Sequence, residues 1–145
     1  MNRLGHLGFS LLVFSPLLKF FPISYVLFVI ALAMLPDIDL VLRVEHRKYT
    51  HNVTFAFLTA VLSYVLLASF LLATLAFLSV SLHILSDLMT KQKFAPLYPF
   101  SQKKFALKLF RSDNKPVNYV VFFLGLLSFV HFSNVEVSFD LVRFI

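Results

Sequence analysis

The stretch from residue 53 to residue 90 contains almost no charge, and it constrains the fold more than any other feature. Its only charged or imidazole side chains are Asp87 and His83. One continuous helix of this length would measure about 57 Å, whereas the hydrocarbon core of a bilayer is only about 30 Å thick. The stretch therefore predicts two membrane-crossing helices joined by a turn near Ala68 to Leu71.

Three further apolar segments complete the predicted bundle. They are residues 7–18, 23–35 and 117–132. The first two are separated by Lys19 and Pro22 and predict a short helical hairpin. A mean hydropathy of +0.86 with 14% charged residues is typical of an integral membrane protein. We predict an all-α polytopic bundle of about five transmembrane or partly inserted helices, with residues 1–145 as a single membrane-embedded domain.

The cationic side chains divide unevenly between the two sides of this bundle. Lys19 and Arg143 lie on one side, opposite eleven others. The eleven are Arg3, Arg43, Arg47, Lys48, Lys91, Lys93, Lys103, Lys104, Lys108, Arg111 and Lys115. Cytoplasmic loops of membrane proteins are enriched in Lys and Arg, so the larger set is expected to face the cytoplasm. Topology thus explains the net charge of +6, and we expect no nucleic acid as a stable partner.

The charge count does not by itself settle the N-terminal segments. If residues 7–35 formed one kinked helix or a re-entrant hairpin, the charge division would change little. In the kinked-helix arrangement the N-terminus would move to the other side of the membrane, while the later segments would keep their alternation.

Most histidines and several acidic residues fall at helix ends that share the predicted cytoplasmic side. They are His6, Asp37, Asp39, Glu45, His46, His51, His83 and Asp87. Ionisable side chains at membrane depth cost about 2.5–3.5 kcal/mol each, so we expect them to be paired with a partner such as a metal ion. Because the chain has no Cys, such a site would use nitrogen and oxygen ligands, which suit Zn²⁺ or a similar divalent ion.

Two of the spacings suggest helical ligands. His83 and Asp87 are four residues apart and share one face of a helix, which suits two metal ligands and a buried His–Asp hydrogen bond about equally. His6 lies between Gly5 and Gly8, whose lack of side chains permits a close approach of other backbone segments. Alone, His6 is a weak signal.

The remaining candidates lie in a predicted loop, residues 37–51. Asp37 and Asp39 follow a proline at which the preceding helix should break, and alone they are more often a polar helix terminus. His46 and His51 are expected in a loop that leads into a helix capped by Thr50. Alone, these histidines are more often solvated loop residues.

Taken together, the motifs GHLGFS, LPDID, HRKYTH, HILSDLMT and LYPFSQKKF occur in an order that is far more specific than any one of them. In that order they resemble the YdjM-like, LexA-regulated family of membrane-bound metal-dependent hydrolases. The family is grouped with zinc-dependent phospholipase C and single-strand-specific nucleases, which are helical enzymes that cleave phosphate esters at a metal cluster. The resemblance implies hydrolysis of a phosphate ester, either of a phospholipid or of another phosphodiester or monoester.

The resemblance also implies roles for individual residues. The implied metal ligands are His6, Asp37, His46, His51, His83 and Asp87, with Asp39 as a further ligand or a supporting carboxylate. This set exceeds the three or four ligands of one catalytic zinc, so we expect two or three divalent ions and a metal-activated water as nucleophile. Arg47 is predicted to bind the phosphate or to meet lipid headgroups, and Glu45 is a candidate general base. Candidates for orienting the ligands are Thr50, Ser86 and Thr90.

Two other functions agree with parts of the pattern. A non-enzymatic metal-binding or metal-transporting membrane protein would use the same ligands, but a transporter needs ionisable residues along a path through the bilayer. A structural membrane protein would use His–Asp pairs as contacts between helices and would bind no stoichiometric metal. Since the candidates gather at one end, we expect a hydrolase of the cell membrane with its site on the cytoplasmic side. His131, about 21 Å along the last helix, is expected to lie outside the site.

Overall fold

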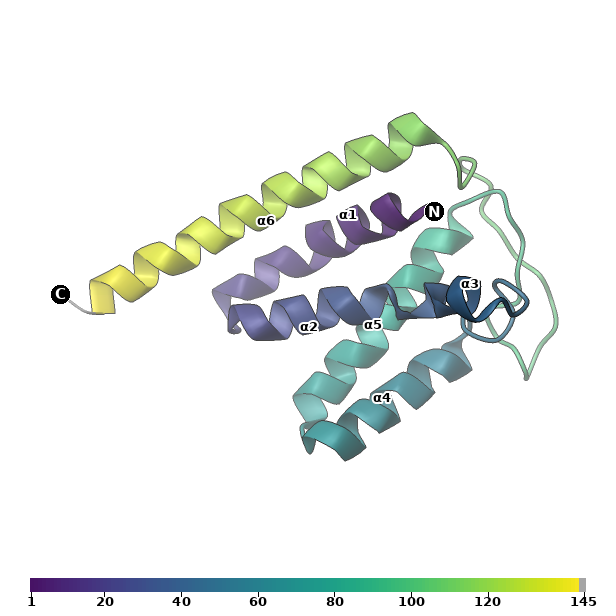
Figure 1. Cartoon of the computed structure of the whole chain (residues 1–145), viewed down its shortest axis with the longest axis horizontal. Helices are drawn as coiled ribbons and strands as arrows, with labels where there is room; N and C mark the ends of the chain where they lie inside the picture. The colour runs from purple at the N-terminus through teal and green to yellow at the C-terminus, as the bar shows by residue number, and fades with distance from the viewer. Residues whose placement is uncertain (144–145) are drawn as a thin grey trace.

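The computed structural model describes the backbone of residues 1–143 and the side chains of residues 1–133. Its helices run alternately between the two ends of a bundle (Figure 1). They are α1 (Arg3–Phe14), η1 (Ser15–Lys19), α2 (Ile23–Ala33), η2 (Leu35–Asp37), α3 (Ile38–Leu42), α4 (Val53–Leu67), α5 (Phe70–Leu88) and α6 (Lys115–Arg143). The fold confirms the predicted all-α membrane bundle.

The predicted turn and the predicted hairpin are both present. Ala68 adopts a left-handed conformation with φ of 49° and ends α4 immediately before α5. The amino group of Met1 contacts Asp87 near the end of α5, so the N-terminus lies at the same end of the bundle as the candidate ligands. At the other end, the Lys19 ammonium lies 5.0 Å from the ring centre of Phe132. These contacts exclude one kinked helix over residues 7–35; the Arg143 side chain lies outside the described residues.

Two local predictions were wrong, and one helix is longer than its apolar segment. Asn52, and not Thr50, caps α4, because its side-chain oxygen accepts a hydrogen bond of 2.9 Å from the amide of Phe55. The predicted loop 37–51 contains the end of η2 and the short helix α3, which ends where Arg43 takes a left-handed conformation with φ of 55°. The last helix contains the predicted apolar segment 117–132 and extends beyond it, from Lys115 to Arg143.

The bundle buries apolar side chains of α1, η1, α2 and α5 against one another and leaves other large apolar side chains outside. The principal buried cluster comprises Phe14, Leu18, Val26, Val29, Ile30 and Leu75. Phe57, Phe70 and Phe123 are exposed, as expected for surfaces that contact lipid. Three segments are long and apolar enough to cross a membrane, namely Ile23–Leu42, Phe70–Leu88 and Lys115–Ser133, while α4 is a shorter apolar helix.

Two glycines allow α1 and α6 to touch through their backbones. A Cβ added at Gly8 would lie 2.2 Å from Cα of Phe122, and one added at Gly125 would lie 2.1 Å from the carbonyl oxygen of Gly8. Close backbone contact of this kind is a common means of helix packing in membranes. It fixes α1, and therefore His6, against the long helix α6.

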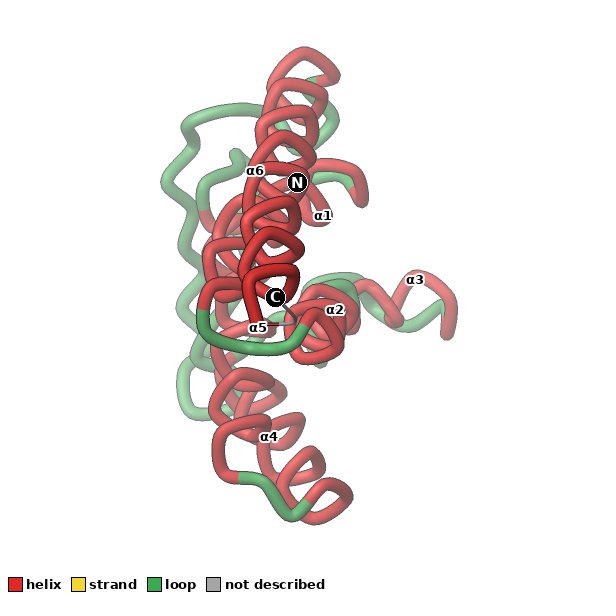
Figure 2. The backbone as a smooth tube through the Cα atoms, turned by 90° about the vertical axis from the view of Figure 1, so that its left-hand side faces the viewer, coloured by secondary structure: helices red, strands yellow, loops and turns green. Residues whose placement is uncertain are grey.

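The segment between α5 and α6 folds back along the ligand-rich end of the bundle (Figure 2). Single β-bridges join Thr90 to Phe110 and Phe94 to Phe105 within it. The amide of Val53 also donates a 2.9 Å hydrogen bond to the carbonyl of Pro96, which ties the segment to the start of α4. We call residues 91–111 the basic loop, because Lys and Arg recur along it.

Candidate metal centre

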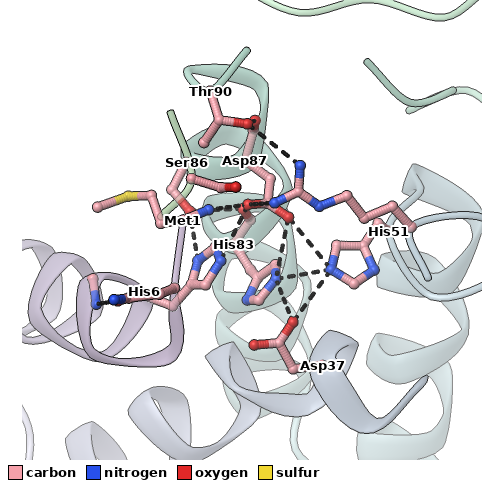
Figure 3. A network of polar contacts seen from close by, with 12 residues as sticks. Met1, His6, Asp37, His51, His83, Ser86, Asp87 and Thr90 are labelled. Atoms are coloured by element: carbon pink, nitrogen blue, oxygen red, sulfur yellow. Dashed lines mark hydrogen bonds and ion pairs between the residues drawn. The ribbon is translucent and has the colours of Figure 1, made fainter. Parts of the chain in front are cut away.

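Five of the candidate side chains converge in the interior at one end of the bundle (Figure 3). His6 comes from α1, Asp37 from η2, His51 from the segment before α4, and both His83 and Asp87 from α5. All are buried except Asp37, which lies at the limit between buried and half-buried. They form two overlapping groups in which one donor atom per residue lies within 4.8 Å of the others, His6–His83–Asp87 and Asp37–His51–His83.

The neighbours of His83 determine which of its ring nitrogens carries the proton. Nδ1 lies 2.7 Å from the carbonyl oxygen of Ala33, which can only accept a hydrogen bond. Nδ1 therefore donates, and the neutral ring presents the lone pair of Nε2 to the cluster. This is the arrangement that prepares an imidazole to bind a metal.

His51 is oriented in the same way by a carboxylate. Its Nδ1 lies 3.2 Å from Oδ2 of Asp39 and 2.9 Å from the hydroxyl of Thr50, whose proton is donated to the same Asp39 oxygen over 2.9 Å. Nδ1 of His51 is therefore the donor, and Nε2 carries a lone pair that faces the cluster. A carboxylate behind a ligating histidine both orients the ring and increases its basicity.

His6 follows the same pattern through a hydroxyl. Ser86 Oγ donates to the carbonyl of His83 over 2.8 Å and lies 2.8 Å from Nδ1 of His6, so it can accept from that nitrogen. Nε2 of His6 is buried and has no hydrogen-bond partner. It lies 3.2 Å from Oδ1 of Asp87, close to it but without the alignment of a hydrogen bond.

The separations between donor atoms agree with a tetrahedral metal site. Nε2 of His51 lies 3.1 Å from Nε2 of His83, 3.5 Å from Oδ1 of Asp37 and 3.4 Å from Oδ2 of Asp87. Nε2 of His83 lies 3.7 Å and 3.8 Å from the same two carboxylate oxygens. Ligands at 2.0–2.1 Å from a tetrahedral ion are separated by about 3.3 Å.

Two further features favour a cation at this position. The Nε2 atoms of His51 and His83 lie 3.1 Å apart. If both rings are neutral, the lone pairs of these two atoms face each other, which is repulsive unless a positive charge lies between them. Oδ2 of Asp87 is buried and has no hydrogen-bond partner. Buried charged oxygens are costly without a partner, and a divalent ion is one that these donors can bind. The residues therefore suit the predicted metal.

The other oxygen of Asp87 belongs to a different set of contacts. Oδ1 accepts from the guanidinium of Arg47 over 2.7 Å and is also contacted by the amino group of Met1. Arg47 is itself buried, adopts a left-handed conformation with φ of 65°, and donates to the hydroxyl of Thr90 over 3.3 Å. Asp87 thus joins the candidate metal centre to two cationic groups.

Asp39 and His46 lie beside the centre and form a hydrogen-bonded network of their own. Asp39 accepts from the amide of Arg47 and the hydroxyl of Thr50, and Nδ1 of His46 lies 3.0 Å from its Oδ1. With His51 as a fourth contact, the roughly four acceptor positions of a carboxylate are filled. Although Asp39, His46 and His51 also lie within metal-binding distance of one another, this geometry favours a supporting carboxylate over a metal ligand.

The remaining predicted site residues are placed farther out. Glu45 is largely exposed and forms a 2.6 Å ion pair with Lys48. His131 is exposed on α6, and its ring contacts that of Phe132. The hydroxyls of Thr50, Ser86 and Thr90 each contact a predicted site residue, as described above.

Sequence reasoning missed three groups at this end of the bundle. The carbonyl of Ala33 cannot be identified from a residue type, because every residue has one. No motif in the sequence indicates that the Met1 amine would contact the site. Asn118 is fully buried near the start of α6 and accepts a 3.2 Å hydrogen bond from the amide of Asn2, which ties α6 to the N-terminus. An isolated amide in an apolar segment was the available signal for Asn118.

A protein-family model matches this chain over residues 1–143, and the family is described as YdjM inner membrane protein. The chain belongs to the YdjM family. This confirms the family suggested by the motifs and a location in the membrane. No curated protein matches the chain. No solved structure matches it either.

Together, the family match and the geometry support a membrane protein whose His and Asp clusters can bind a metal. The number and identity of the ions, the ligand roles and the side of the membrane on which the site lies stay predictions.

Proposed function

We propose that this protein is a membrane-bound, metal-dependent hydrolase of phosphate esters, with its site on the cytoplasmic side of the membrane. The observation that carries the proposal is the convergence of His6, His51 and His83, whose Nδ1 atoms are all engaged with neighbours, on the carboxylates of Asp37 and Asp87. Such a set of fixed imidazoles and carboxylates is typical of Zn²⁺ sites in hydrolytic enzymes.

The proposed residues have separable tasks. His51, His83, Asp37 and Oδ2 of Asp87 would hold one ion, and His6, whose Nε2 is buried without a hydrogen-bond partner, would contribute to a second. When bound, a divalent ion supplies Lewis acidity to a phosphoryl group and lowers the pKa of coordinated water towards about 7. Asp39 and the carbonyl of Ala33 keep the two central imidazoles in the required tautomer.

Arg47 and His46 are the residues at the border of the centre that are suited to act on a substrate. Arg47 carries a permanent positive charge, and its Nε is buried without a hydrogen-bond partner. His46 is half-buried and has Asp39 behind its Nδ1, an arrangement that can hold a proton at Nε2 and transfer it to a departing oxygen. We propose His46 for this proton transfer in preference to Glu45, whose carboxylate is largely exposed and paired with Lys48.

A second candidate function is supported by the burial of the centre. His51 and His83 are almost inaccessible to solvent, and structural metal sites are closed in this way, whereas catalytic sites keep an open position. A non-enzymatic metal-binding membrane protein would share the centre but would not turn over a substrate.

Hydrolysis of bis(p-nitrophenyl) phosphate by the full chain purified in detergent tests the proposal. We expect activity that a chelator removes and Zn²⁺ restores, and that is lost in Asp37→Ala and in His46→Ala. Metal content should fall in the first variant and persist in the second. Retained metal with no hydrolysis of this ester or of phospholipid vesicles by the unaltered chain would instead support the non-enzymatic function.

A further inference from the structure

A pocket of about 400 Å³ lies beside the metal centre, between the basic loop and the segment that precedes α4. Its lining includes Arg47, Lys48, Lys93 and Lys104, and among its lining residues only Glu45 is acidic. Four cations against one carboxylate give the lining a formal charge of +3, with His46 counted as neutral. The pocket therefore suits an anion.

The four cations are not equivalent. Lys48 is paired with Glu45 at 2.6 Å, and Arg47 is paired with Asp87 at 2.7 Å. Lys93 and Lys104 form no ion pair with any residue that the structure describes. These two, which we call the lysine pair, are thus the cations of the pocket that remain available to a ligand.

The fold of the basic loop brings the lysine pair together. Phe94 and Phe105 form a β-bridge, with hydrogen bonds of 3.3 Å and 2.8 Å between their backbones. Lys93 and Lys104 precede these two residues in the sequence, and because the bridge is antiparallel they lie on either side of it, from where both line the pocket. Two ammonium groups held on adjacent backbone segments are suited to the several oxygens of one phosphate group.

The pocket and the metal centre share one wall. Arg47 lines the pocket, is 5% exposed, and donates to the same Asp87 whose other oxygen faces the metal centre. A phosphate in the pocket would therefore meet the lysine pair on the outer side and Arg47 on the inner side, next to the centre.

The basic loop also carries large apolar side chains on its outside. They are Leu97, Phe100, Phe105, Leu107 and Leu109, and Phe100 is 89% exposed. Lys and Arg alternate with them along the loop, a pattern typical of segments that lie in the interface of a membrane with anionic lipids. A loop placed there lets a ligand keep its acyl chains in the bilayer while its headgroup enters the pocket.

We propose that this pocket binds the phosphate-bearing headgroup of a membrane lipid through Lys93 and Lys104. The assignment rests on the proposed function insofar as the lipid is the substrate, but the binding step can be tested without hydrolysis. A water-soluble phosphate ester offers the same anionic group, and the exposed apolar side chains of the basic loop favour the lipid.

The test compares binding of dihexanoyl phosphatidic acid with binding of glycerol 3-phosphate by isothermal titration of the full chain in detergent. In Lys93→Gln/Lys104→Gln we expect binding of the lipid to weaken by roughly tenfold or more, because two charge-assisted hydrogen bonds are lost. The matched control is Lys91→Gln/Lys103→Gln, which removes equal charge from the same loop at positions that do not line the pocket. Its affinity should change less than threefold, and both variants should keep the metal content of the unaltered protein.

The outcomes separate this proposal from the proposed function. An equal loss of affinity in the two double variants would refute headgroup binding in the pocket. Failure of the unaltered protein to bind either probe would also refute it. If glycerol 3-phosphate bound as tightly as dihexanoyl phosphatidic acid, the proposal that the ligand is a membrane lipid would be refuted. Selective loss of lipid binding in Lys93→Gln/Lys104→Gln, together with an unaltered protein that hydrolyses no ester, would uphold the pocket and refute the hydrolase.

Discussion

The role of Asp39 can be separated from the roles of the metal ligands by the substitution Asp39→Asn. Asp39 is buried, and its Oδ2 accepts from the Arg47 amide at 3.0 Å and from the Thr50 hydroxyl at 2.9 Å, with Nδ1 of His51 at 3.2 Å. An Asn amide oxygen at the Oδ2 position would preserve these three contacts. The substitution therefore removes the negative charge behind His51 while leaving every proposed metal ligand in place.

The expected effect is a moderate loss of metal affinity at unchanged stoichiometry. Removing a supporting group behind a ligating histidine typically weakens metal binding by about 10–100-fold, which corresponds to roughly 1.4–2.7 kcal/mol. His51→Ala removes the Nε2 ligand itself and should abolish binding at its proposed site. Competition with a chelating dye during Zn²⁺ titration measures both affinity and stoichiometry for the detergent-purified variants.

The reasoning would be refuted if Asp39→Asn lowered the number of bound ions as much as Asp37→Asn does. Asp39 would then be a ligand, and the group formed by Asp39, His46 and His51 would be a metal site of its own. A helical circular dichroism spectrum identical to that of the unaltered chain is the control for folding, since Asp39 also connects η2 and α3 to the segment before α4.

Three further predictions concern the frame around the centre. His131→Ala should retain metal content and ester hydrolysis, because His131 is exposed on α6 and contacts Phe132; metal analysis showing an emptied site would contradict the placement of α6. Gly125→Leu should destabilise the bundle by about 1–3 kcal/mol or more, because its Cβ would lie 2.1 Å from a backbone oxygen of α1. Its thermal midpoint should therefore be lower than that of the exposed control Leu124→Ala. Since the chain has no cysteine, single cysteines at Ser101 and Ser133 should label from opposite faces of the membrane, and labelling from one face would refute the alternating topology.

The membrane fold could be predicted from the sequence because hydropathy and helix length act over whole segments. The turn at Ala68 followed from the length of the apolar stretch alone, and no special turn residue marks it. Local boundaries were less predictable. Thr50 and Asn52 are both good capping residues, and the choice between them depends on Asp39, which engages the Thr50 hydroxyl from another segment.

The set of candidate ligands could likewise be predicted, but their division into ligands and supporting groups could not. His46 and His51 belong to one motif, yet His51 turns Nε2 towards the buried centre while His46 lies at its edge. The difference comes from tertiary contacts. Asp39 lies between the two rings and contacts Nδ1 of both, so the orientation of each ring depends on where η2 and α3 place one carboxylate.

Charge at Asp87 links the metal centre to the neighbouring pocket. Its Oδ2 faces the two central imidazoles, and its Oδ1 is engaged by Arg47, which also lines the pocket. A carboxylate shared in this way loses part of its negative charge to each neighbour, so a stronger interaction on one side weakens the other. An anionic headgroup that drew Arg47 away from Asp87 would leave more charge for the metal, and thermodynamic linkage requires that a bound metal favour the headgroup to the same extent. Zn²⁺ should therefore tighten binding of dihexanoyl phosphatidic acid in the unaltered chain, and the same factor should appear in the Zn²⁺ affinity when the lipid is added first.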